Sequence, residues 1–354
     1  MVKRRKARVV KLGKVKIGGN APISIQSMTE TDTSDWRETI RQIHRLEKAG
    51  CEIIRLAVPD WQSVKTLAKI KKYIDIALVA DIHFLTELAL EAINQGVDGL
   101  RINPGTIPSH KNLKKIFQAA KTAKIPVRIG INAGSLPRRT AGPLCEDMVR
   151  AALDTLRICK DLEFHDLIFS LKAFDVGETI AAYQLLAKKC SYPFHLGITE
   201  AGPIRSGTIR SALGIGCLLH EGIGDTIRVS LTANPVEEVK VAREILSALN
   251  LRKFGPTIIS CPTCGRCQVN LIKIVGKLED SLKKIFPANK AGPDIKVAVM
   301  GCVVNGPGEA RQADIGLALD KKEGWLFKKG EKIKKVPEKK CLEALIKEIK
   351  KFKA

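Results

Sequence analysis

The sequence predicts an α/β protein in which a (β/α)8 TIM-type barrel precedes a smaller α+β domain. Eight short apolar runs rich in β-branched residues lie between residues 22 and 231, and segments with helical periodicity separate them. The composition changes after Asn250, and the chain ends in a Lys-rich segment. No low-complexity linker separates the two parts. We therefore expect a barrel domain over residues 1–250 and a second domain over residues 251–354.

Each apolar run has the length and composition of a buried parallel strand. A preceding segment, Arg8–Gly19, alternates polar and apolar residues and predicts a hairpin that closes the barrel floor. The eight barrel strands are expected at Pro22–Met28, Ile53–Val58, Ile76–Ile82, Gly99–Pro104, Pro126–Asn132, Asp166–Lys172, Phe194–Thr199 and Asp225–Leu231.

The segment Thr33–Gly50 shows the helical pattern most clearly. Its apolar residues recur on one face, Ser34 or Asp35 can cap its start, and Gly50 ends it. Leu85–Gln95 and Pro235–Leu249 behave similarly. In the second domain we expect strands at Thr257–Ser260 and Lys296–Met300, a helix at Gln268–Phe286, and a helical end within Lys328–Ala354.

The bulk composition limits the classes of function. The 60 Lys and Arg against 37 Asp and Glu give a net charge of +23, which predicts an anionic partner: nucleic acid, a phosphorylated metabolite or an acidic protein. We find no apolar run of about 18 residues and no signal core after the basic start, so we expect neither a membrane span nor export. Ten scattered cysteines do not resemble a disulfide framework, which favours the reducing cytoplasm.

Charged and polar residues gather at the expected carboxyl ends of the barrel strands, where barrel active sites lie. Four arginines and a lysine aimed into one mouth require a multivalent anion, and guanidinium groups match phosphate oxygens, so we expect a di- or triphosphate ligand. The alternative is that these cations are solvated or salt-bridged parts of the barrel. The strand-end residues are Arg55, Asp81, His83, Arg101, Asn103, Arg128, Asn132, Ser170, Lys172, Thr199, Glu200, Arg228 and Ser230.

Asp81 and His83 are two residues apart on a strand end, so their side chains face the same way. Such a pair suits orientation of a substrate hydroxyl or transfer of a proton. The alternative is a histidine packed in the core.

The second domain carries a cysteine pattern typical of a metal site. Cys261, Cys264 and Cys267 follow one another at two-residue spacing, and Cys302 lies in a later loop rich in glycine. This spacing suits either structural zinc or an iron–sulfur cluster, and the spacing alone does not separate the two. The other cysteines are expected to be small buried apolar residues: Cys51, Cys145, Cys159, Cys190, Cys217 and Cys341.

Several longer segments resemble the family of hydroxymethylbutenyl diphosphate synthases, iron–sulfur enzymes of the non-mevalonate isoprenoid pathway. The resemblance covers nearly the whole chain and fits the bacterial two-domain form, without an inserted middle domain. The segments that carry it are Ile25-Gln-Ser-Met-Thr29, Ala80-Asp-Ile-His-Phe84, Leu100-Arg-Ile-Asn-Pro-Gly105, Val127-Arg-Ile-Gly-Ile-Asn132, Leu196-Gly-Ile-Thr-Glu-Ala-Gly202, Ile227-Arg-Val-Ser-Leu231, Ser260-Cys-Pro-Thr-Cys-Gly-Arg266 and Met300-Gly-Cys-Val-Val-Asn-Gly-Pro-Gly-Glu-Ala310.

The resemblance implies a 4Fe–4S cluster held by Cys261, Cys264 and Cys302, with Glu309 as fourth ligand. Spacing alone would instead favour Cys267 as the third ligand. A carboxylate is more easily displaced from iron than a thiolate, so Glu309 can leave one iron open to substrate.

The implied reaction opens 2-C-methyl-D-erythritol 2,4-cyclodiphosphate reductively and dehydrates it to 4-hydroxy-3-methylbut-2-enyl diphosphate. Single electrons come from flavodoxin or ferredoxin. Asp81, His83, Glu200 and Glu309 are the expected catalytic residues. The expected substrate-binding residues are Arg55, Arg101, Asn103, Arg128, Asn132, Lys172, Thr199, Arg228, Ser230 and Asn305.

The resemblance also implies a head-to-tail homodimer in which each cluster domain caps the barrel of the partner. The connection at Leu249–Gly255 is short, and after the last barrel helix the chain is expected to lie near the barrel floor.

Two other classes of protein share part of this pattern. A zinc-ribbon nucleic-acid binder would explain the cysteines and the charge, but aromatic residues are only 5% and cations gather at strand ends, so we expect no nucleic acid. A pterin- or corrinoid-linked barrel methyltransferase has similar strand ends but does not require the cysteine domain.

Overall fold

A computed structural model describes residues 2–107, 109–136, 139–287, 292–302 and 306–353. The chain forms two compact units, Met1–Arg252 and Lys253–Ala354, and each is described by itself. Within the described ranges no helix is both long enough and apolar enough to cross a membrane.

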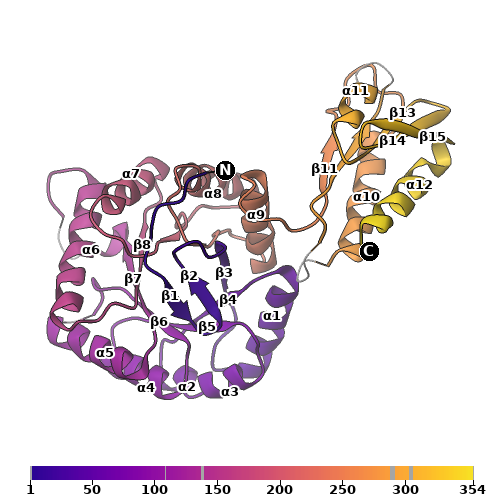
Figure 1. Ribbon diagram of the computed structural model, residues 1–354. Coiled ribbons are helices and arrows are strands. Elements are labelled where there is room, and N and C mark those ends of the chain that lie inside the picture. Colours follow the sequence, from indigo (N-terminus) through magenta and orange to yellow (C-terminus); the bar gives the residue numbers. More distant parts are fainter. Residues whose placement is uncertain (1, 108, 137–138, 288–291, 303–305, 354) are drawn as a thin grey trace. The chain divides into compact units, whose positions relative to one another are not determined.

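The first unit is a barrel of eight parallel strands inside a ring of helices (Figure 1). The strands follow chain order around the sheet from β3 to β8, and β10 pairs with β3 and β9. A bridge between Phe169 and Phe194 joins the two ends of the sheet. The strands are β3 (Ser24–Met28), β4 (Ile53–Ala57), β5 (Ala77–Ile82), β6 (Gly99–Ile102), β7 (Val127–Asn132), β8 (Leu167–Lys172), β9 (His195–Leu196) and β10 (Thr226–Ile227).

All eight predicted strands are confirmed, but β9 and β10 contain only two residues each. The helices around them are α1 (Trp36–Ala49), α2 (Trp61–Val64), α3 (Leu67–Lys72), α4 (Thr86–Asn94), α5 (His110–Ala123), α6 (Leu144–Asp161), α7 (Val176–Ala187), α8 (Ile204–His220) and α9 (Pro235–Ala248), with a short 3-10 turn, η1, at Ala133–Ser135.

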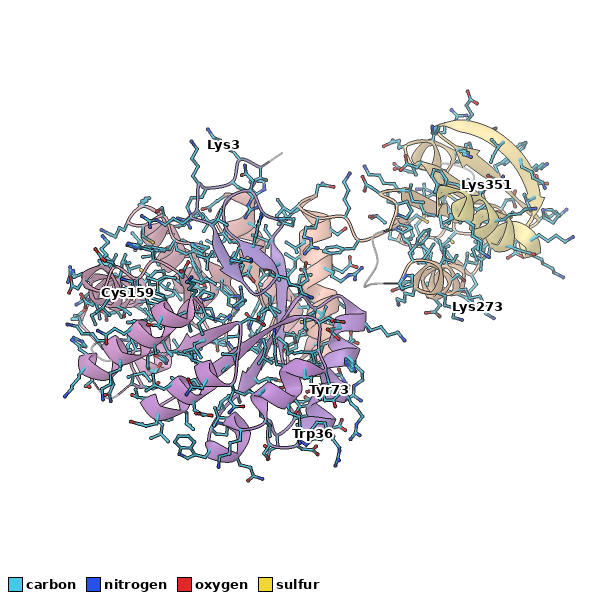
Figure 2. The ribbon with its side chains drawn as sticks, turned by 60° about the horizontal axis from the view of Figure 1, so that its bottom comes forward. Lys3, Trp36, Tyr73, Cys159, Lys273 and Lys351 are labelled. Atoms are coloured by element: carbon cyan, nitrogen blue, oxygen red, sulfur yellow. The ribbon has the colours of Figure 1, made fainter. Side chains whose placement is uncertain are left out.

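Helix α1 shows how the sequence sets its own ends. Asp35 is the N-cap, because its carboxylate accepts a hydrogen bond from the Glu38 amide at 3.1 Å. Gly50 ends the helix in the left-handed conformation, with φ of 103°. On the outside of the barrel Trp36 stacks on Tyr73, with 6.3 Å between ring centroids (Figure 2).

The predicted hairpin closes the barrel floor. Strands β1 (Val10–Leu12) and β2 (Val15–Ile17) pair antiparallel, and their buried side chains pack against apolar residues of the barrel strands, including Ile53 and Val79. An apolar plug at this end leaves the carboxyl ends of the strands as the polar end of the interior.

The chain also leaves the barrel at the floor. Arg252, which follows α9, donates hydrogen bonds to the Ile23 carbonyl at 2.9 Å and to Glu52 Oε2 at 2.6 Å. Ile23 and Glu52 directly precede β3 and β4, so Arg252 lies at the amino ends of the strands.

The second unit is a five-stranded sheet packed against two long helices. Strands β11, β12 and β13 are parallel, and β14 is antiparallel to β13 and β15. The elements are β11 (Thr257–Ser260), β12 (Lys296–Met300), β13 (Ile315–Leu319), β14 (Glu323–Lys328), β15 (Glu331–Pro337), α10 (Leu271–Ile285), α11 (Gly306–Arg311), α12 (Glu338–Lys350) and the 3-10 turn η2 (Lys351–Lys353).

The predictions for β11, β12, α10 and the terminal helix α12 are confirmed, whereas β13, β14 and β15 were not predicted. Glycine and alanine interrupt β13, and both residue types have low strand propensity. Gly316 is required there, because a Cβ at this position would lie 2.4 Å from the Ala310 carbonyl oxygen.

None of the ten cysteines, all of which lie within the described residues, forms a disulfide. The prediction of burial outside the 261–302 region is confirmed for Cys51, Cys145, Cys159 and Cys341, but it is wrong for Cys217, which is exposed, and Cys190 is only partly buried. The apolar positions of a helix do not all face the core, and Cys217 lies on the outer face of α8.

Candidate active site

The barrel interior brings together the five predicted cations. Arg55, Arg101, Arg128 and Lys172 lie on four different strands and are buried, and Arg228 follows β10 and is partly buried. Their mutual proximity affects their ionisation. Burial lowers the pKa of Lys172 well below its usual value, and Arg228, Arg55, Arg128 and Arg101 lower it further.

The arginines show the same competition between burial and charge. Burial and the neighbouring cations lower the pKa of Arg128 well below its usual value. Burial also lowers the pKa of Arg55 to about 9, although the carboxylate of Asp81 favours the charged form. Holding this many cations in one interior is unfavourable unless a further anion joins them.

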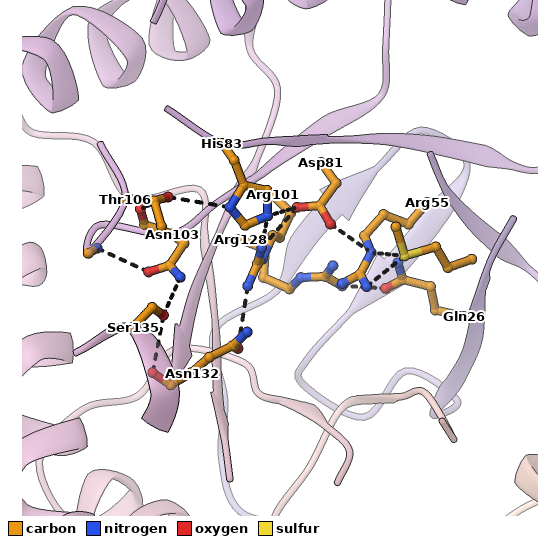
Figure 3. Close-up of polar contacts among 12 residues, drawn as sticks. Gln26, Arg55, Asp81, His83, Arg101, Asn103, Thr106, Arg128, Asn132 and Ser135 are labelled. Atoms are coloured by element: carbon orange, nitrogen blue, oxygen red, sulfur yellow. Dashed lines mark hydrogen bonds and ion pairs between the residues drawn. The ribbon is translucent and has the colours of Figure 1, made fainter. Parts of the chain in front are cut away.

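Asp81 is the carboxylate shared by two of the cations (Figure 3). It accepts a hydrogen bond from Arg101 Nη1 at 3.0 Å and lies 3.4 Å from Arg55 Nε. Burial raises the pKa of Asp81, but Arg55, His83 and Arg101 outweigh it and hold that pKa well below its usual value. Asp81 is therefore ionised and orients both guanidinium groups.

His83 joins this network from the same strand end, as predicted. Its Nε2 lies 3.5 Å from Asp81 Oδ1 but only 2.7 Å from Arg101 Nη1 (Figure 3). A guanidinium only donates, so in the contact with Arg101 Nε2 is the acceptor. Nδ1 faces Thr106 Oγ1 at 3.4 Å. His83 thus faces Arg101 and Asp81 with Nε2 and Thr106 with Nδ1.

Several donors in this interior have no hydrogen-bond partner among the residues that the structure describes. Arg128 Nη1 donates to Gln26 Oε1, but Arg128 Nε and Nη2 make no hydrogen bond, nor do Gln26 Nε2 and Arg228 Nε. Among the described residues, Lys172 Nζ also has no hydrogen-bond or ion-pair partner. Buried donors are normally paired, so these atoms identify where a ligand with several acceptor oxygens fits.

The carboxylates present do not balance the cations. Asp81 pairs with Arg55 and Arg101, and Glu238 lies 3.5 Å from Arg228. In the part of the chain that the structure describes, neither Arg128 nor Lys172 has a carboxylate within 4.0 Å. Salt bridges within the barrel therefore do not account for the cluster.

The predicted amides lie beside the cations. Asn103 Nδ2 donates to Ser135 Oγ at 2.6 Å and Asn103 Oδ1 accepts from the Gly105 amide, which ties the loop after β6 to the loop after β7. Asn132 Oδ1 accepts from Arg101 Nη2 at 3.4 Å (Figure 3).

Among the described side chains, no hydrogen bond or ion pair fixes the roles of the other predicted mouth residues. Thr199 and Ser230 are partly buried and Ser170 is buried. Glu200 is exposed and adopts a left-handed backbone, with φ of 53°. A non-glycine residue in this conformation marks a backbone that the surrounding loop constrains.

Two inward-facing glycines, which we did not predict as site residues, make room for the cations. A Cβ on Gly130 would lie 2.4 Å from Arg101 Nε, and one on Gly197 would lie 2.7 Å from Lys172 Nζ. The inward position of Gly130 could have been predicted from the alternation of side chains along a strand, because Arg128, Gly130 and Asn132 point to the same face of β7.

Sequence reasoning also missed Gln26 and His195. His195 is fully buried on β9 and neither ring nitrogen has a partner. Burial lowers the pKa of His195 well below its usual value, and Arg128 and Lys172 add to the effect. His195 therefore contributes a neutral ring beneath the cations. A two-residue strand offers too little pattern to reveal this.

The predicted cluster ligands lie at one edge of the second unit's sheet. Cys261 follows β11, Cys302 follows β12, and these strands are parallel with Ser260 opposite Val299. Glu309 lies on α11, which packs on β12 and β13, and its side chain is exposed. The predicted substrate residue Asn305 lies outside the described residues.

The neighbouring cysteine, Cys267, makes hydrogen bonds and packing contacts of its own. Its amide donates to the Cys264 carbonyl at 2.8 Å, and its Sγ donates to the Val269 carbonyl at 3.3 Å. Cys267 Sγ also lies against Gly301, where a Cβ would be only 2.4 Å away.

The donor set fits an iron–sulfur cluster in its chemistry. Three thiolates and a carboxylate are ligands that iron accepts, and Cys264 is exposed while Cys261 and Cys302 are partly buried. Within the described residues, no three His, Cys, Asp or Glu side chains are gathered closely enough to hold a metal ion. In the described structure these donors therefore share a position at one edge of the sheet, without being gathered around a single point.

Family models match both units of the chain. The GcpE TIM-barrel domain matches residues 7–243, and the GcpE protein C-terminal domain matches residues 257–351. The chain belongs to the GcpE family.

Full-length relatives carry one name. A protein of Thermodesulfovibrio yellowstonii is 53% identical over 99% of this chain and 100% of its own length. One of Ruminiclostridium cellulolyticum is 51% identical over 98% of both chains. Both are named 4-hydroxy-3-methylbut-2-en-1-yl diphosphate synthase (flavodoxin), so the family predicted from the motifs is confirmed.

A solved structure supports the barrel independently. Dihydropteroate synthase of Yersinia pestis superposes with a TM-score of 0.51 over 68% of this chain and 97% of its own, at 14% sequence identity. At this identity the likeness shows the fold alone, and the predicted TIM-type barrel is confirmed.

Proposed function

We propose that this chain catalyses the reaction named for its relatives, the conversion of 2-C-methyl-D-erythritol 2,4-cyclodiphosphate to 4-hydroxy-3-methylbut-2-enyl diphosphate. The reaction uses two electrons, delivered singly, opens the ring at a carbon–oxygen bond and releases water. The observation that carries the proposal is the set of buried donor atoms without a hydrogen-bond partner among the described residues on Arg128 and Arg228, next to the buried ammonium group of Lys172.

These donors bind the diphosphate. The fork of Arg128 presents Nε and Nη2, and Lys172 presents a single ammonium. When the ring opens, negative charge grows on a phosphate oxygen that was part of the ring. Cations already fixed around that oxygen stabilise this charge without reorganising.

Asp81 acts as a positioning residue. It is buried and ionised, and it fixes the orientation of Arg55 and Arg101 before substrate arrives. The three other residues predicted to be catalytic reach solvent: His83 partly, and Glu200 and Glu309 fully. Of these, His83 and Glu200 are the candidates to carry a proton to or from the substrate, whereas Glu309 is the expected fourth cluster ligand.

Cys261, Cys264, Cys302 and Glu309 would hold a 4Fe–4S cluster. When bound, the cluster would supply the electrons one at a time at the ring carbon–oxygen bond. The support is the donor chemistry, the common sheet edge of the Cys261 and Cys302 loops, and the separate engagement of Cys267 with Val269. Ten cysteines without a disulfide among the described residues are consistent with a reducing cytoplasm.

We further propose a head-to-tail homodimer in which the cluster unit of one protomer serves the barrel of its partner. The support is the position of Arg252 at the floor, which is the end of the barrel opposite the cation cluster. Flavodoxin is the expected donor, as in the names of the relatives, and ferredoxin is the alternative.

The test is an anaerobic assay with reduced flavodoxin and the cyclic diphosphate, in which the open-chain diphosphate should accumulate. Reconstituted protein should be brown, with about four iron atoms per chain. A colourless protein that binds one zinc ion and makes no product would contradict the proposal.

A further inference from the structure

Four exposed lysines lie at the same edge of the second unit's sheet as the cysteine loops. Lys321 and Lys322 form the turn between β13 and β14, and Lys339 and Lys340 lie in the first turn of α12. Because β13 is parallel to β12, and β12 to β11, the carboxyl end of β13 points to the edge where Cys261 and Cys302 lie.

A hydrogen bond joins the two pairs of lysines. The Glu338 amide donates to the Lys322 carbonyl at 3.0 Å, and Glu323 is opposite Pro337 in the sheet register. The start of α12 is therefore directly beside the β13–β14 turn. We name Lys321, Lys322, Lys339 and Lys340 the basic rim.

The lysines of the basic rim are not neutralised locally. No carboxylate of the described residues lies within 4.0 Å of any of their ammonium groups. The nearest acidic residues in sequence are Asp320, Glu323 and Glu338, and Glu323 pairs with Lys335 at 2.5 Å. Lys328 and Lys351, at the other end of α12, instead both pair with Glu348.

Arg266 extends the positive surface into the cysteine loop itself. It is exposed, stands between Cys264 and Cys267, and has no carboxylate partner among the described side chains. Among the predicted cluster ligands, Glu309 is the only carboxylate. The edge that carries the thiols is therefore bordered by positive charge.

We propose that the basic rim is the docking surface for the electron donor, a redox protein with an acidic face. This inference rests on the proposed function, since only a protein that receives electrons at the cysteine edge needs a donor there. Fixed positive charge beside the acceptor attracts an acidic donor from a distance and orients its redox group toward the thiols. Exposed lysines without ion-pair partners suit this purpose, because the donor must dissociate after each electron that it delivers.

The test reverses the rim charge in pairs, Lys321→Glu with Lys322→Glu, and Lys339→Glu with Lys340→Glu. The second pair lies at a helix amino terminus, where Glu is more favourable than Lys, so the fold is not at risk. The matched control is Lys347→Glu with Lys350→Glu, the same change of charge on exposed residues at the far end of α12. Figure 1 shows α12 running to the C-terminus, away from the end of the sheet where α11 lies.

Turnover is measured with reduced flavodoxin and, separately, with dithionite-reduced methyl viologen, a small donor that needs no docking surface. At low salt each rim variant should raise KM for flavodoxin about tenfold or more and lose most of its salt dependence. The viologen rate should stay at the wild-type value. The control should change KM for flavodoxin less than about twofold.

Unchanged KM for flavodoxin in the rim variants would overturn the inference. A rise in KM for the cyclic diphosphate with viologen as donor would overturn it too, because the rim would then bind substrate. If the wild-type protein makes no product even with viologen, the proposed function fails instead. A calorimetric titration of flavodoxin into each variant then decides docking without turnover, and equal affinity in rim and control variants would exclude it.

Discussion

Lys172 shows at the scale of one residue that the barrel interior is built for a ligand. It is 7% exposed and has no partner among the described residues, and burial lowers its pKa well below the usual value. Between the lowered pKa and the ordinary value of about 10.4, the unfolded chain binds more protons than the folded one. Stability of the ligand-free protein therefore rises with pH through that range.

Lys172→Met should stabilise the ligand-free protein at pH 7, because the side chain keeps its length and loses a charge that burial disfavours. The expected gain is about 1–4 kcal/mol in the free energy of unfolding, measured in urea. The control is Lys114→Met on the outside of α5, which should change stability by less than about 0.5 kcal/mol. A less stable Lys172→Met protein would mean that the ammonium is compensated within the barrel.

Arg128→Met tests the same group of cations by its effect on substrate binding. Charged hydrogen bonds to phosphate are worth about 1.5–3 kcal/mol, so the dissociation constant for the cyclic diphosphate should rise about 10–150-fold. The melting temperature should move little, because two of the guanidinium nitrogens have no partner. A large drop in melting temperature with unchanged affinity would assign Arg128 to the barrel framework.

At the scale of elements, the sequence predicted those strands and site residues that depend on a local pattern of residues. Every barrel strand and the floor hairpin follow from apolar runs, and the cations follow from their places at strand ends. Strands β13, β14 and β15 were not predicted, because pairing with neighbouring strands decides their structure more than their composition does. Gly130, Gly197 and His195 escaped for a related reason: their roles depend on Arg101, Lys172 and Arg128, which approach them from other strands.

The β11 and β12 loops give a prediction about ligation. Cys302→Ser should lose the cluster, whereas Cys267→Ser should keep it, because Cys267 Sγ already donates to the Val269 carbonyl and packs against Gly301. Iron per chain after anaerobic reconstitution distinguishes them: about four atoms for Cys267→Ser and close to none for Cys302→Ser. The reverse result would make Cys267 the third thiolate ligand.

At the scale of the whole molecule, the position of Arg252 at the floor favours sites shared between two chains. Arg128→Met chains lack substrate binding and Cys302→Ser chains lack the cluster, so each homodimer should be inactive. Mixing them in equal amounts under conditions that exchange subunits should restore about a quarter of wild-type activity. Half of the dimers would then be mixed, each with one intact site.

Activity that stays absent after mixing would mean that each chain serves its own barrel. The control for exchange is a mixture of two differently tagged wild-type proteins, from which the mixed dimer should be purified in the same yield.

The hairpin at the barrel floor affects how the substrate enters the barrel and how the product leaves it. Val10, Leu12 and Ile17 close the floor end of the interior, so we expect the product to leave by the mouth, along the path by which the substrate arrived. Substrate and product both carry a diphosphate, and the same cations attract both. We therefore expect the product and inorganic pyrophosphate to compete with the substrate for one binding site. We also expect a barrel closed at its floor to slow release of the product rather than cleavage of the carbon–oxygen bond.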